Sequence, residues 1–510
     1  MSDMKKILYT FLVLGLGLCL GLPLGATAQD QLQNGKVDTN FRPDLDANPQ
    51  AVIPLKDGKV LIGGTFEHVG GRDVTGVMRL NADGSADGSF NAGGTGVNGV
   101  VTHIALQSDG KILVLGVFTT YNDTPVGQII RLNQDGSLDT TFKNDNAITL
   151  DGSAHTSQYK WNLQPNKLLV SPDDSFYVLG GFNRVNGKLA PLIARFSAAG
   201  VRDESFLPTD KEIYFKSSPY VDGAVLLPSG DIYFGGMING YNGSPLNKRL
   251  FHIDAQGKYD ESFAKPKFDF GGPRALAMKG ADTLLVAGSF YESFGQKTPL
   301  MTALHLDGTP IDGFKVYDFS IPDAEDMING LVVTDQYIII GGGDIQVPKR
   351  SFVYALDKTG AALTPDFDFG KGPNQIVSGL TYDPAGWLYV SGFFTEFDGV
   401  SVKYFTRCKI AGSALSVETP SAAMTAVRVA VSEGHFCLHH LESSAEVSLY
   451  SSDGVLCASY PSVAEGEMIS HKLPEGLYLM VITQATGTQQ VKVGEEATHV
   501  EPARRVVGKS

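Results

Sequence analysis

A unit of about fifty residues recurs along this chain and limits its possible folds more than any other feature. Each copy ends in an Asp-x-x-Phe pattern or a variant of it, with the Phe at positions Phe41, Phe90, Phe142, Phe206, Phe263, Phe314 and Phe367. Successive Phe residues lie roughly 50 to 60 positions apart, a period typical of propeller blades and solenoid repeats. The sequence therefore predicts repeated copies of one small structural unit.

The copy between Leu106 and Phe142 shows the internal order most clearly. Its segment KILVLGVF is almost continuously apolar, which indicates a strand buried on both faces. Asp109-Gly110 precedes this strand and Asp135-Gly136 follows the next one, and both pairs favour tight turns because Asp and Gly tolerate a positive φ. With a short strand before it and the Asp-x-x-Phe segment after it, each unit predicts a four-stranded propeller blade.

The buried strand occurs seven times, as VLIGGTF, ILVLGVF, FYVLGGF, IYFGGMI, LLVAGSF, YIIIGGG and LYVSGFF. The seventh copy has no Asp-x-x-Phe after it, and the missing segment stands at the other end of the repeats, as Val37–Phe41. Pairing the two ends would remove two exposed sheet edges. We therefore predict an all-β fold in which residues 36–415 form a closed seven-bladed β-propeller, with Val37–Phe41 beside Lys409–Leu415.

Residues 36–415 resemble the delta-60 repeat, a β-propeller repeat of bacterial secreted proteins. The segments LQSDGKILVLGVF and RLNQDGSLDTTF carry the resemblance, which is close in the first two units and weaker in units four to six. The family offers no general catalytic motif to carry over. Kelch repeats also place a Gly-Gly pair at a strand end, but their Tyr and Trp positions are missing here.

The repeat is no longer found after Leu415. Residues 416–424 read as a linker rich in small and polar residues, and residues 425–493 as a small C-terminal β-sandwich with alternating apolar residues. Within it, VSLYSSDG, LPEGLYLMV and a final VKV resemble the type A sorting domain of the type IX secretion system. The resemblance implies the type IX secretion machinery as a partner. Residues 494–510 follow as a tail, where such domains usually stop.

The N-terminus reads as a signal peptide over residues 1–28. Two lysines precede an apolar run, and Ala26-Thr27-Ala28 gives a cleavage site between Ala28 and Gln29. A membrane anchor is the alternative, but the run is short for a spanning helix. Later stretches are not apolar enough to cross a bilayer, so no transmembrane segment is expected in the mature chain. Together with the sorting resemblance, this predicts a secreted or cell-surface protein of a Gram-negative bacterium, associated with the outer membrane.

Charge and cysteine content narrow the possible partners. The net charge of −14 and the absence of a basic stripe argue against nucleic acid as a partner. Export leaves Cys408, Cys437 and Cys457. Since three is odd, at least one thiol is unpaired within the chain, while a Cys437–Cys457 bridge and buried free thiols both stay open.

The sequence offers no motif for catalysis or for a cofactor. The Asp-x-Asp-Gly-like clusters, such as Asn81-Ala82-Asp83-Gly84 with Asp87, lack the terminal Glu of a calcium loop, so we interpret them as turns and predict no metal site. His439 and His440 are adjacent in a predicted strand and point to opposite faces. No pair of carboxylates stands out, and we expect neither a catalytic residue nor a cofactor.

Loop length indicates where a ligand would bind. In an up-and-down blade, the loops after strands two and four share one face, and here they are long and variable. Tyr159 and Trp161 lie in the loop 143–166, and Tyr220 lies in the loop 207–223. Aromatic residues on polar loops suit contact with carbohydrate or protein. The alternative is that these rings fold back over the blade rims.

These features favour a binding or interaction module that presents one face to a glycan or a surface protein. One alternative is a propeller glycoside hydrolase or lyase with an active site in the central channel. A structural component of a surface layer is the other.

Overall fold

The structure is a computed structural model of the chain. It describes residues 34–149, 165–206, 220–238, 240–241, 244–245, 249–263, 266, 268, 271–298, 300–315, 326–344, 351–363, 367–410, 428–432, 435–439, 444–451, 456–464, 467, 469–470, 477–484, 487–494 and 504–506. These residues form strands and turns and contain no helix, so none of them belongs to a helix able to cross a membrane. The chain divides into two compact units, residues 1–412 and 413–510.

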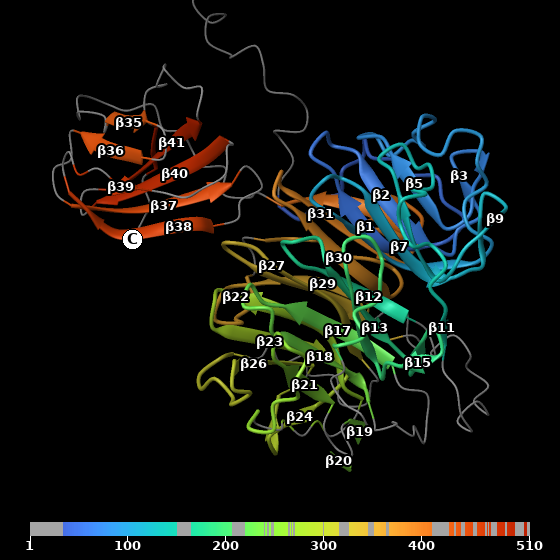
Figure 1. Ribbon diagram of the computed structural model, residues 1–510. Coiled ribbons are helices and arrows are strands. Elements are labelled where there is room, and N and C mark those ends of the chain that lie inside the picture. Colours follow the sequence, from blue (N-terminus) through green and yellow to red (C-terminus); the bar gives the residue numbers. More distant parts are fainter. Residues whose placement is uncertain are drawn as a thin grey trace, which may run out of the picture. The chain divides into compact units, whose positions relative to one another are not determined.

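The first unit is built from three-stranded antiparallel sheets that follow one another along the chain (Figure 1). Among the described residues, seven of these sheets have an inner, a middle and a third strand, and an eighth joins the short strands β11 (Ile148–Thr149), β14 (Arg184–Val185) and β15 (Lys188–Leu189). The inner strands are β1 (Pro49–Pro54), β6 (Val100–Leu106), β12 (Pro165–Val170), β17 (Tyr220–Leu226), β22 (Pro273–Lys279), β27 (Met327–Val333) and β30 (Val377–Asp383). The middle strands are β2 (Val60–Gly64), β7 (Ile112–Val117), β13 (Phe176–Gly180), β18 (Ile232–Met237), β23 (Thr283–Gly288), β28 (Ile338–Gly343) and β31 (Trp387–Gly392). The third strands are β5 (Val77–Leu80), β10 (Ile129–Leu132), β16 (Ile193–Phe196), β21 (Leu250–Ile253), β26 (Met301–His305), β29 (Phe352–Leu356) and β34 (Phe405–Lys409).

A fourth, very short segment joins each third strand through an isolated bridge, for example Leu132 with Leu138 and Phe196 with Arg202. The Asp-Gly pairs form turns as predicted, with Gly110 at a φ of 79° and Gly136 at 84°. Each inner strand contacts the inner strands of the sheets before and after it, and β30 contacts β1. The predicted all-β propeller is confirmed; the number of blades stays a prediction, with which these sheets agree.

The N-terminal segment completes the last sheet. Val37 forms an antiparallel bridge with Cys408 of β34, the N–H of Gly35 donates to the carbonyl of Lys409 at 2.7 Å, and the N–H of Lys409 donates to the carbonyl of Lys36 at 2.9 Å. Phe41 is fully buried against the rings of Tyr389 and Phe405. The segment therefore pairs with Phe405–Lys409, whereas residues 411–415 of the predicted partner lie outside the described residues.

The loops after the middle strands are more regular than the sequence indicated. Most contain a hairpin of two-residue strands: β3 (His68–Val69) with β4 (Arg72–Asp73), β8 (Thr120–Tyr121) with β9 (Thr124–Pro125), β14 (Arg184–Val185) with β15 (Lys188–Leu189), β19 (Gly240–Tyr241) with β20 (Ser244–Pro245), β24 (Glu292–Ser293) with β25 (Gln296–Lys297), and β32 (Glu396–Phe397) with β33 (Val400–Ser401). The strand β11 (Ile148–Thr149), which lies ahead of the inner strand β12, pairs with β14 of the same blade. Short backbone pairings therefore order much of the face that carries the long loops.

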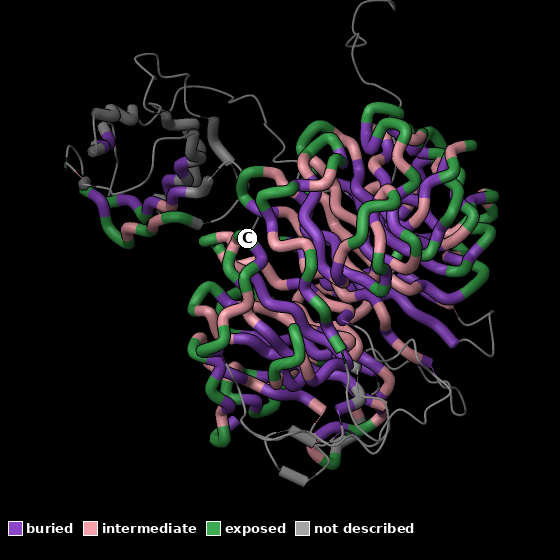
Figure 2. The backbone as a smooth tube through the Cα atoms, turned by 45° about the vertical axis from the view of Figure 1, so that its right-hand side comes forward, coloured by how far each residue is buried: buried purple, intermediate pink, exposed green. Residues whose placement is uncertain are grey.

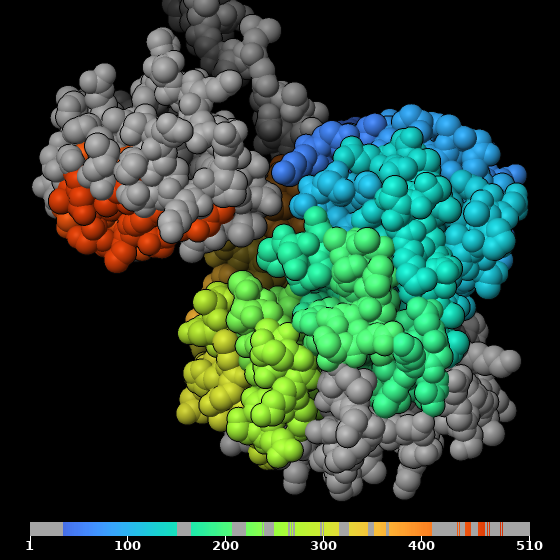
Figure 3. All heavy atoms as spheres, viewed as in Figure 1, coloured from blue at the N-terminus to red at the C-terminus, as the bar shows by residue number. Residues whose placement is uncertain are grey.

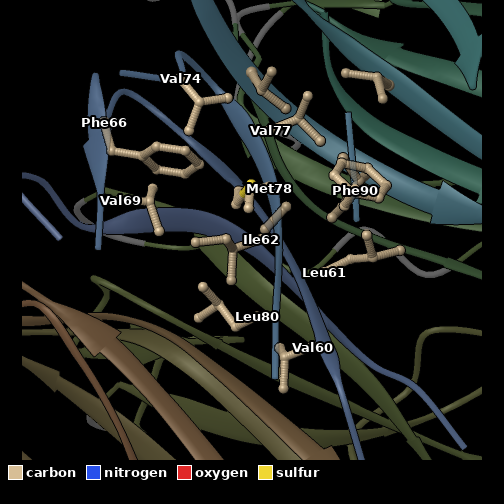
Figure 4. Packing of buried hydrophobic residues seen from close by; sticks show 14 of the residues in the cluster. Val60, Leu61, Ile62, Phe66, Val69, Val74, Val77, Met78, Leu80 and Phe90 are labelled. Carbon is tan, nitrogen blue, oxygen red and sulfur yellow. The ribbon is translucent and has the colours of Figure 1, made fainter. Parts of the chain in front are cut away.

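Apolar side chains fill the space within and between the sheets, while exposed residues gather at the turns (Figure 2). In the first blade, Ile62 lies beside Met78 and Leu80 of the third strand, and Phe66 and Val69 of the loop hairpin cover the end of this cluster (Figure 4). Successive parts of the chain lie next to one another on the surface of this unit (Figure 3). Each blade thus shares its core with its neighbours in the sequence.

The second unit contains two sheets. One joins β35 (Arg428–Ser432), β36 (His435–His439) and β39 (Ile469–Ser470), and the other joins β38 (Leu456–Val463), β37 (Ala445–Ser451), β40 (Leu477–Gln484), β41 (Gly487–Gly494) and β42 (Arg504–Val506). Phe436 and Leu438 of the first sheet belong to one buried cluster with Val447 and Ile482 of the second, as in a sandwich. Within the expected tail over 494–510, the three described residues of β42 pair with β41 and extend the sheet.

Candidate functional site

The Asp and Phe of the Asp-x-x-Phe pattern make contacts within the blades. Asp139 accepts hydrogen bonds from Nε of Arg131 at 2.7 Å, from Nζ of Lys111 at 2.8 Å and from the hydroxyl of Thr141 at 2.6 Å. The guanidinium of Arg131 lies 5.0 Å from the centre of the Phe142 ring. Burial alone would raise the pKa of Asp139, but these hydrogen bonds hold it well below its usual value. The Asp139 carboxylate therefore has its hydrogen-bond partners within the protein.

The same arrangement recurs in other blades. A third-strand Arg binds the Asp and lies over the Phe of the same unit in three further sets: Arg407 with Asp38 and Phe41, Arg79 with Asp87 and Phe90, and Arg195 with Asp203 and Phe206. The turn carboxylates are also occupied: Asp83 and Asp135 each accept hydrogen bonds from the N–H and hydroxyl of the Ser two positions later. Within the described residues, no three metal-ligating side chains come together.

The residues that the sequence singled out for binding are not brought together by the described structure. Tyr159 and Trp161 lie outside the described residues, as do Ala28 and Gln29 at the expected cleavage site. Tyr220 is not in a loop: it is the first residue of β17 and pairs with Met237. The predicted loop 207–223 is therefore shorter at its C-terminal end.

A ring of polar residues, which sequence reasoning missed, lies at the start of the inner strands. Every inner strand has an irregular register at the same place, where one extra residue interrupts the pairing with the middle strand. These bulge residues are Gln50, Thr102, Asn166, Asp222, Arg274, Asn329 and Ser378. A bulge leaves its extra residue unpaired and re-aims its side chain. All seven are polar although the strands around them are largely apolar.

Several bulge side chains link one inner strand to the next. The hydroxyl of Thr102 donates to the carbonyl of Pro165 at 2.7 Å, Nδ2 of Asn166 donates to the carbonyl of Val221 at 2.6 Å, and Nδ2 of Asn329 donates to the carbonyl of Val377 at 2.9 Å. In each case the acceptor directly precedes the next bulge residue. The bulges therefore connect neighbouring blades at one end of the central channel, on the side of the propeller that carries the long loops.

A cavity of about 330 Å³ occupies the channel and is lined by residues from all seven inner strands. Its charged lining residues and its histidine lie on four consecutive inner strands: His103, Lys167, Asp222 and Arg274. The opposite sector offers uncharged polar groups, among them Gln50, Asn329 and Ser378. The cavity thus has a charged side and a neutral polar side.

The charged residues are only partly compensated by the protein. An Nη of Arg274 lies 3.8 Å from Oδ2 of Asp222, a distance beyond hydrogen bonding, and Oδ2 of Asp222 has no hydrogen-bond partner. Nδ1 of His103 is likewise buried without a partner. Lys167 is half-buried on the cavity wall and makes no hydrogen bond or ion pair among the described residues. Unsatisfied buried polar groups are rare in proteins and call for an explanation such as a bound ion, water or ligand.

Burial shifts the titration of this group. It lowers the pKa of Lys167 against the opposing attraction of Asp222, and it raises the pKa of Asp222 against the charges of Arg274 and Lys167. Burial, together with the charge of Lys167, lowers the pKa of His103 to about 3, so this imidazole is neutral at pH 7. Burial thus disfavours the charged forms of Lys167, Asp222 and His103 alike.

The sequence does contain a signal for this site. Each inner strand has a polar residue near its start, as in VTHIAL, PNKLLV, VDGAVL, PRALAM and INGLVV. In the first two of these, a second polar residue follows and lines the cavity, namely His103 and Lys167. The residue type differs from blade to blade, so an alignment on identical residues overlooks it. Only the ring arrangement brings these positions to one channel.

Three segments of the chain match the model of one family, the domain of unknown function (DUF5122) β-propeller. They are residues 55–90, 107–142 and 171–206. The first unit carries β-propeller repeats. Each matched segment begins at the turn before a middle strand and ends at the Phe of Asp-x-x-Phe. A search of curated proteins found no relative of similar sequence.

Solved structures of low sequence identity resemble this chain weakly. The extracellular domain of a hybrid two-component system protein of B. thetaiotaomicron is 11% identical, with a TM-score of 0.41, over 94% of this chain and 60% of that one. PorZ, a surface component of the type IX secretion system of Porphyromonas gingivalis, is 13% identical, with a TM-score of 0.29, over 92% of this chain and 53% of that one. A gluconolactonase of Xanthomonas campestris is 16% identical, with a TM-score of 0.32, over 59% of this chain and 83% of that one. The chain thus spans little more than half the length of the first two.

Proposed function

We propose that this chain is an exported β-propeller that acts as a binding module at the cell surface. The observation that carries the proposal is the channel cavity, where polar side chains from all seven inner strands converge and buried atoms of His103 and Asp222 lack a partner. The repeated Asp, Arg and Phe residues are occupied within the blades and are not available to a ligand. The ligand we propose is a glycan or a component of a surface protein. The resemblance to a repeat of secreted proteins and the long loops on one face favour these two classes.

The composition of the cavity favours binding over glycoside hydrolysis. Most glycoside hydrolases use two carboxylates that flank the scissile bond. Among the described residues that line the cavity, Asp222 is the one carboxylic acid. A binding site has no need of a second.

Asp222 also provides the observation in favour of a second candidate, an enzyme working in the channel. A buried carboxyl group whose pKa is raised suits general acid catalysis. In that case Asp222 would donate a proton and Arg274 or Lys167 would stabilise developing negative charge. Structural assembly into a surface layer is the third candidate.

The route to the surface is proposed from the second unit. The pattern VSLYSSDG, LPEGLYLMV and VKV resembles a type A sorting domain, and these segments lie in β37, β40 and β41 or directly beside them. We assign the type IX secretion machinery as the partner of this unit, after removal of residues 1–28. The mature protein would then be secreted or held at the outer membrane.

A binding screen tests the proposed function. The chain from Gln29 to Ser510 is applied to an array of neutral and acidic glycans, and hydrolysis of the same glycans is measured in parallel. We expect saturable binding without turnover. Turnover that Asp222→Asn abolishes would favour the enzyme, and ordered self-assembly without glycan binding would favour the surface-layer component.

Export is tested separately in the native host. A chain truncated after Leu415 should fold and be retained in the periplasm, because it lacks the proposed sorting unit. The full chain should become accessible to protease added outside intact cells. If the truncated chain also reaches the surface, the sorting assignment is wrong.

A further inference from the structure

The charged sector of the channel is incomplete as the protein alone presents it. Lys167 has no partner among the described residues, and the nearest partner of Arg274 is Asp222 at 3.8 Å. Two cations thus share one carboxylate that does not hydrogen-bond to either. Both cationic residues are half-buried. Because a partly desolvated charge without a close partner is costly, the sector is suited to a ligand that brings negative charge.

The size and the uncharged lining of the cavity limit the range of possible ligands further. A volume of about 330 Å³ lies at the lower end of ligand pockets, which suits one small molecule or one terminal sugar residue rather than a protein segment. The neutral sector supplies amides and hydroxyls from Gln50, Asn329, Ser378 and Thr381. Such groups pair with the hydroxyls of a sugar. A metal cation is disfavoured because two of the three charged groups are cationic.

We propose that the channel binds an acidic sugar residue, with its carboxylate, phosphate or sulfate between Lys167 and Arg274 and its hydroxyls against the neutral sector. Asp222 accepts a hydrogen bond from a ligand hydroxyl through the oxygen that now lacks a partner. This inference rests on the proposed binding function and names the chemical class of its ligand.

The site should be maintained at the expense of stability. Desolvation lowers the pKa of Lys167, which means that the charged form of this side chain disfavours the folded state. Lys167→Met keeps the length of the side chain and removes the charge. We therefore expect this variant to melt at a higher temperature than the parent while losing the ligand. A purely structural lysine would behave in the opposite way.

Calorimetric titration of the chain from Gln29 to Ser510 tests the inference. The probes are galacturonate, glucuronate and glucose 6-phosphate, with galactose and glucose as neutral analogues and inorganic phosphate as a bare anion. We expect at least one acidic sugar to bind tenfold or more tighter than its neutral analogue and than phosphate. Lys167→Met and Arg274→Gln should each weaken that binding tenfold or more. Lys56→Met, an exposed lysine on the turn between β1 and β2, is the matched control and should change nothing.

Each other outcome overturns the inference. Equal affinity for acidic and neutral sugars, or unchanged affinity in Lys167→Met, would show that the site does not recognise negative charge. Equal affinity for inorganic phosphate would show that it does not recognise the sugar. Binding that is lost in Trp161→Ala but kept in Lys167→Met would move the site to the loops and leave the proposed function intact. No binding to any glycan or probe would overturn both.

Discussion

Arg131 is almost fully buried, and five different groups share its guanidinium. It binds Asp139 and lies over Phe142 in its own blade, and it donates to Oε1 of Gln107 at 2.9 Å and to the hydroxyl of Thr141 at 3.3 Å. It also donates to the carbonyl of Ala198 in the following blade at 2.7 Å. A single side chain therefore ties the outer part of one blade to the next, which explains why the Arg and the Asp-x-x-Phe recur together.

Removing the cation at this position should be strongly destabilising. Arg131→Met leaves the buried carboxylate of Asp139 with Lys111 as its only cation, and breaking a buried pair typically costs about 3–5 kcal/mol. Lys143→Met is the matched control, because Lys143 pairs with the exposed Asp145 and such pairs contribute about 1 kcal/mol or less. Denaturant unfolding of both variants measures the difference. Equal midpoints for the two variants would contradict the structural role of Arg131.

Part of this residue-scale picture was open to prediction. The Asp-x-x-Phe ending and the Asp-Gly turns are local patterns, so their positions could be located from the sequence. The partner of Asp139 could not, because Arg131 stands eight positions earlier on another strand and the pairing depends on how the two strands meet. Neither could the link from Arg131 to Ala198, which requires the packing of two blades.

At the scale of single elements, the bulge in each inner strand is the recurrent irregularity. In five blades its extra residue, Gln50, Asp222, Arg274, Asn329 or Ser378, lines the channel cavity. The bulge residues Thr102, Asn166 and Asn329 each donate a hydrogen bond to a carbonyl of the next blade. The strand itself was predictable from its apolar residues. The bulge was not predictable. The alternation of inward and outward side chains along a strand assumes a regular register, so it does not reveal one extra residue.

Thr102→Val tests the contribution of one such link. The substitution keeps the shape of the side chain but removes the donor to the carbonyls of Pro165 and Leu115. Leaving a buried polar group without a partner typically costs about 1–3 kcal/mol. Thr124→Val, on the exposed strand β9, should shift stability by about 0.5 kcal/mol or less. Thermal unfolding of both variants provides the comparison, and an unaffected Thr102→Val would show that the link is not stabilising.

At the scale of the whole first unit, closure of the ring depends on a segment from the far end of the sequence. The bridge between Val37 and Cys408 and the buried ion pair between Asp38 and Arg407, at 2.6 Å, hold the N-terminal segment on β34. This closure was predictable because one copy of the repeat lacked its last piece. The channel site was not, since seven different residues meet there only after closure.

Deleting residues 34–42 should open the ring at this point. The outer edge of β34 would lose its backbone partners, Arg407 would lose the carboxylate of Asp38, and the site between Tyr389 and Phe405 would lose the ring of Phe41. An unpaired edge invites pairing between molecules, so we expect oligomers or aggregates in size-exclusion chromatography. A chain lacking only residues 29–33 serves as the control and should stay monodisperse.

The same deletion can be rescued if the argument is right. A synthetic peptide of residues 34–42 offers the backbone groups of the missing strand together with Asp38 and Phe41. Added in excess, it should occupy the edge of β34 by strand addition, restore the monomer and raise the melting temperature in proportion to its concentration. A peptide with Asp38→Asn and Phe41→Ala keeps the backbone but loses the ion pair and the buried ring, so it should rescue poorly. If the truncated chain is monomeric and melts like the parent without any peptide, the N-terminal segment does not close the propeller.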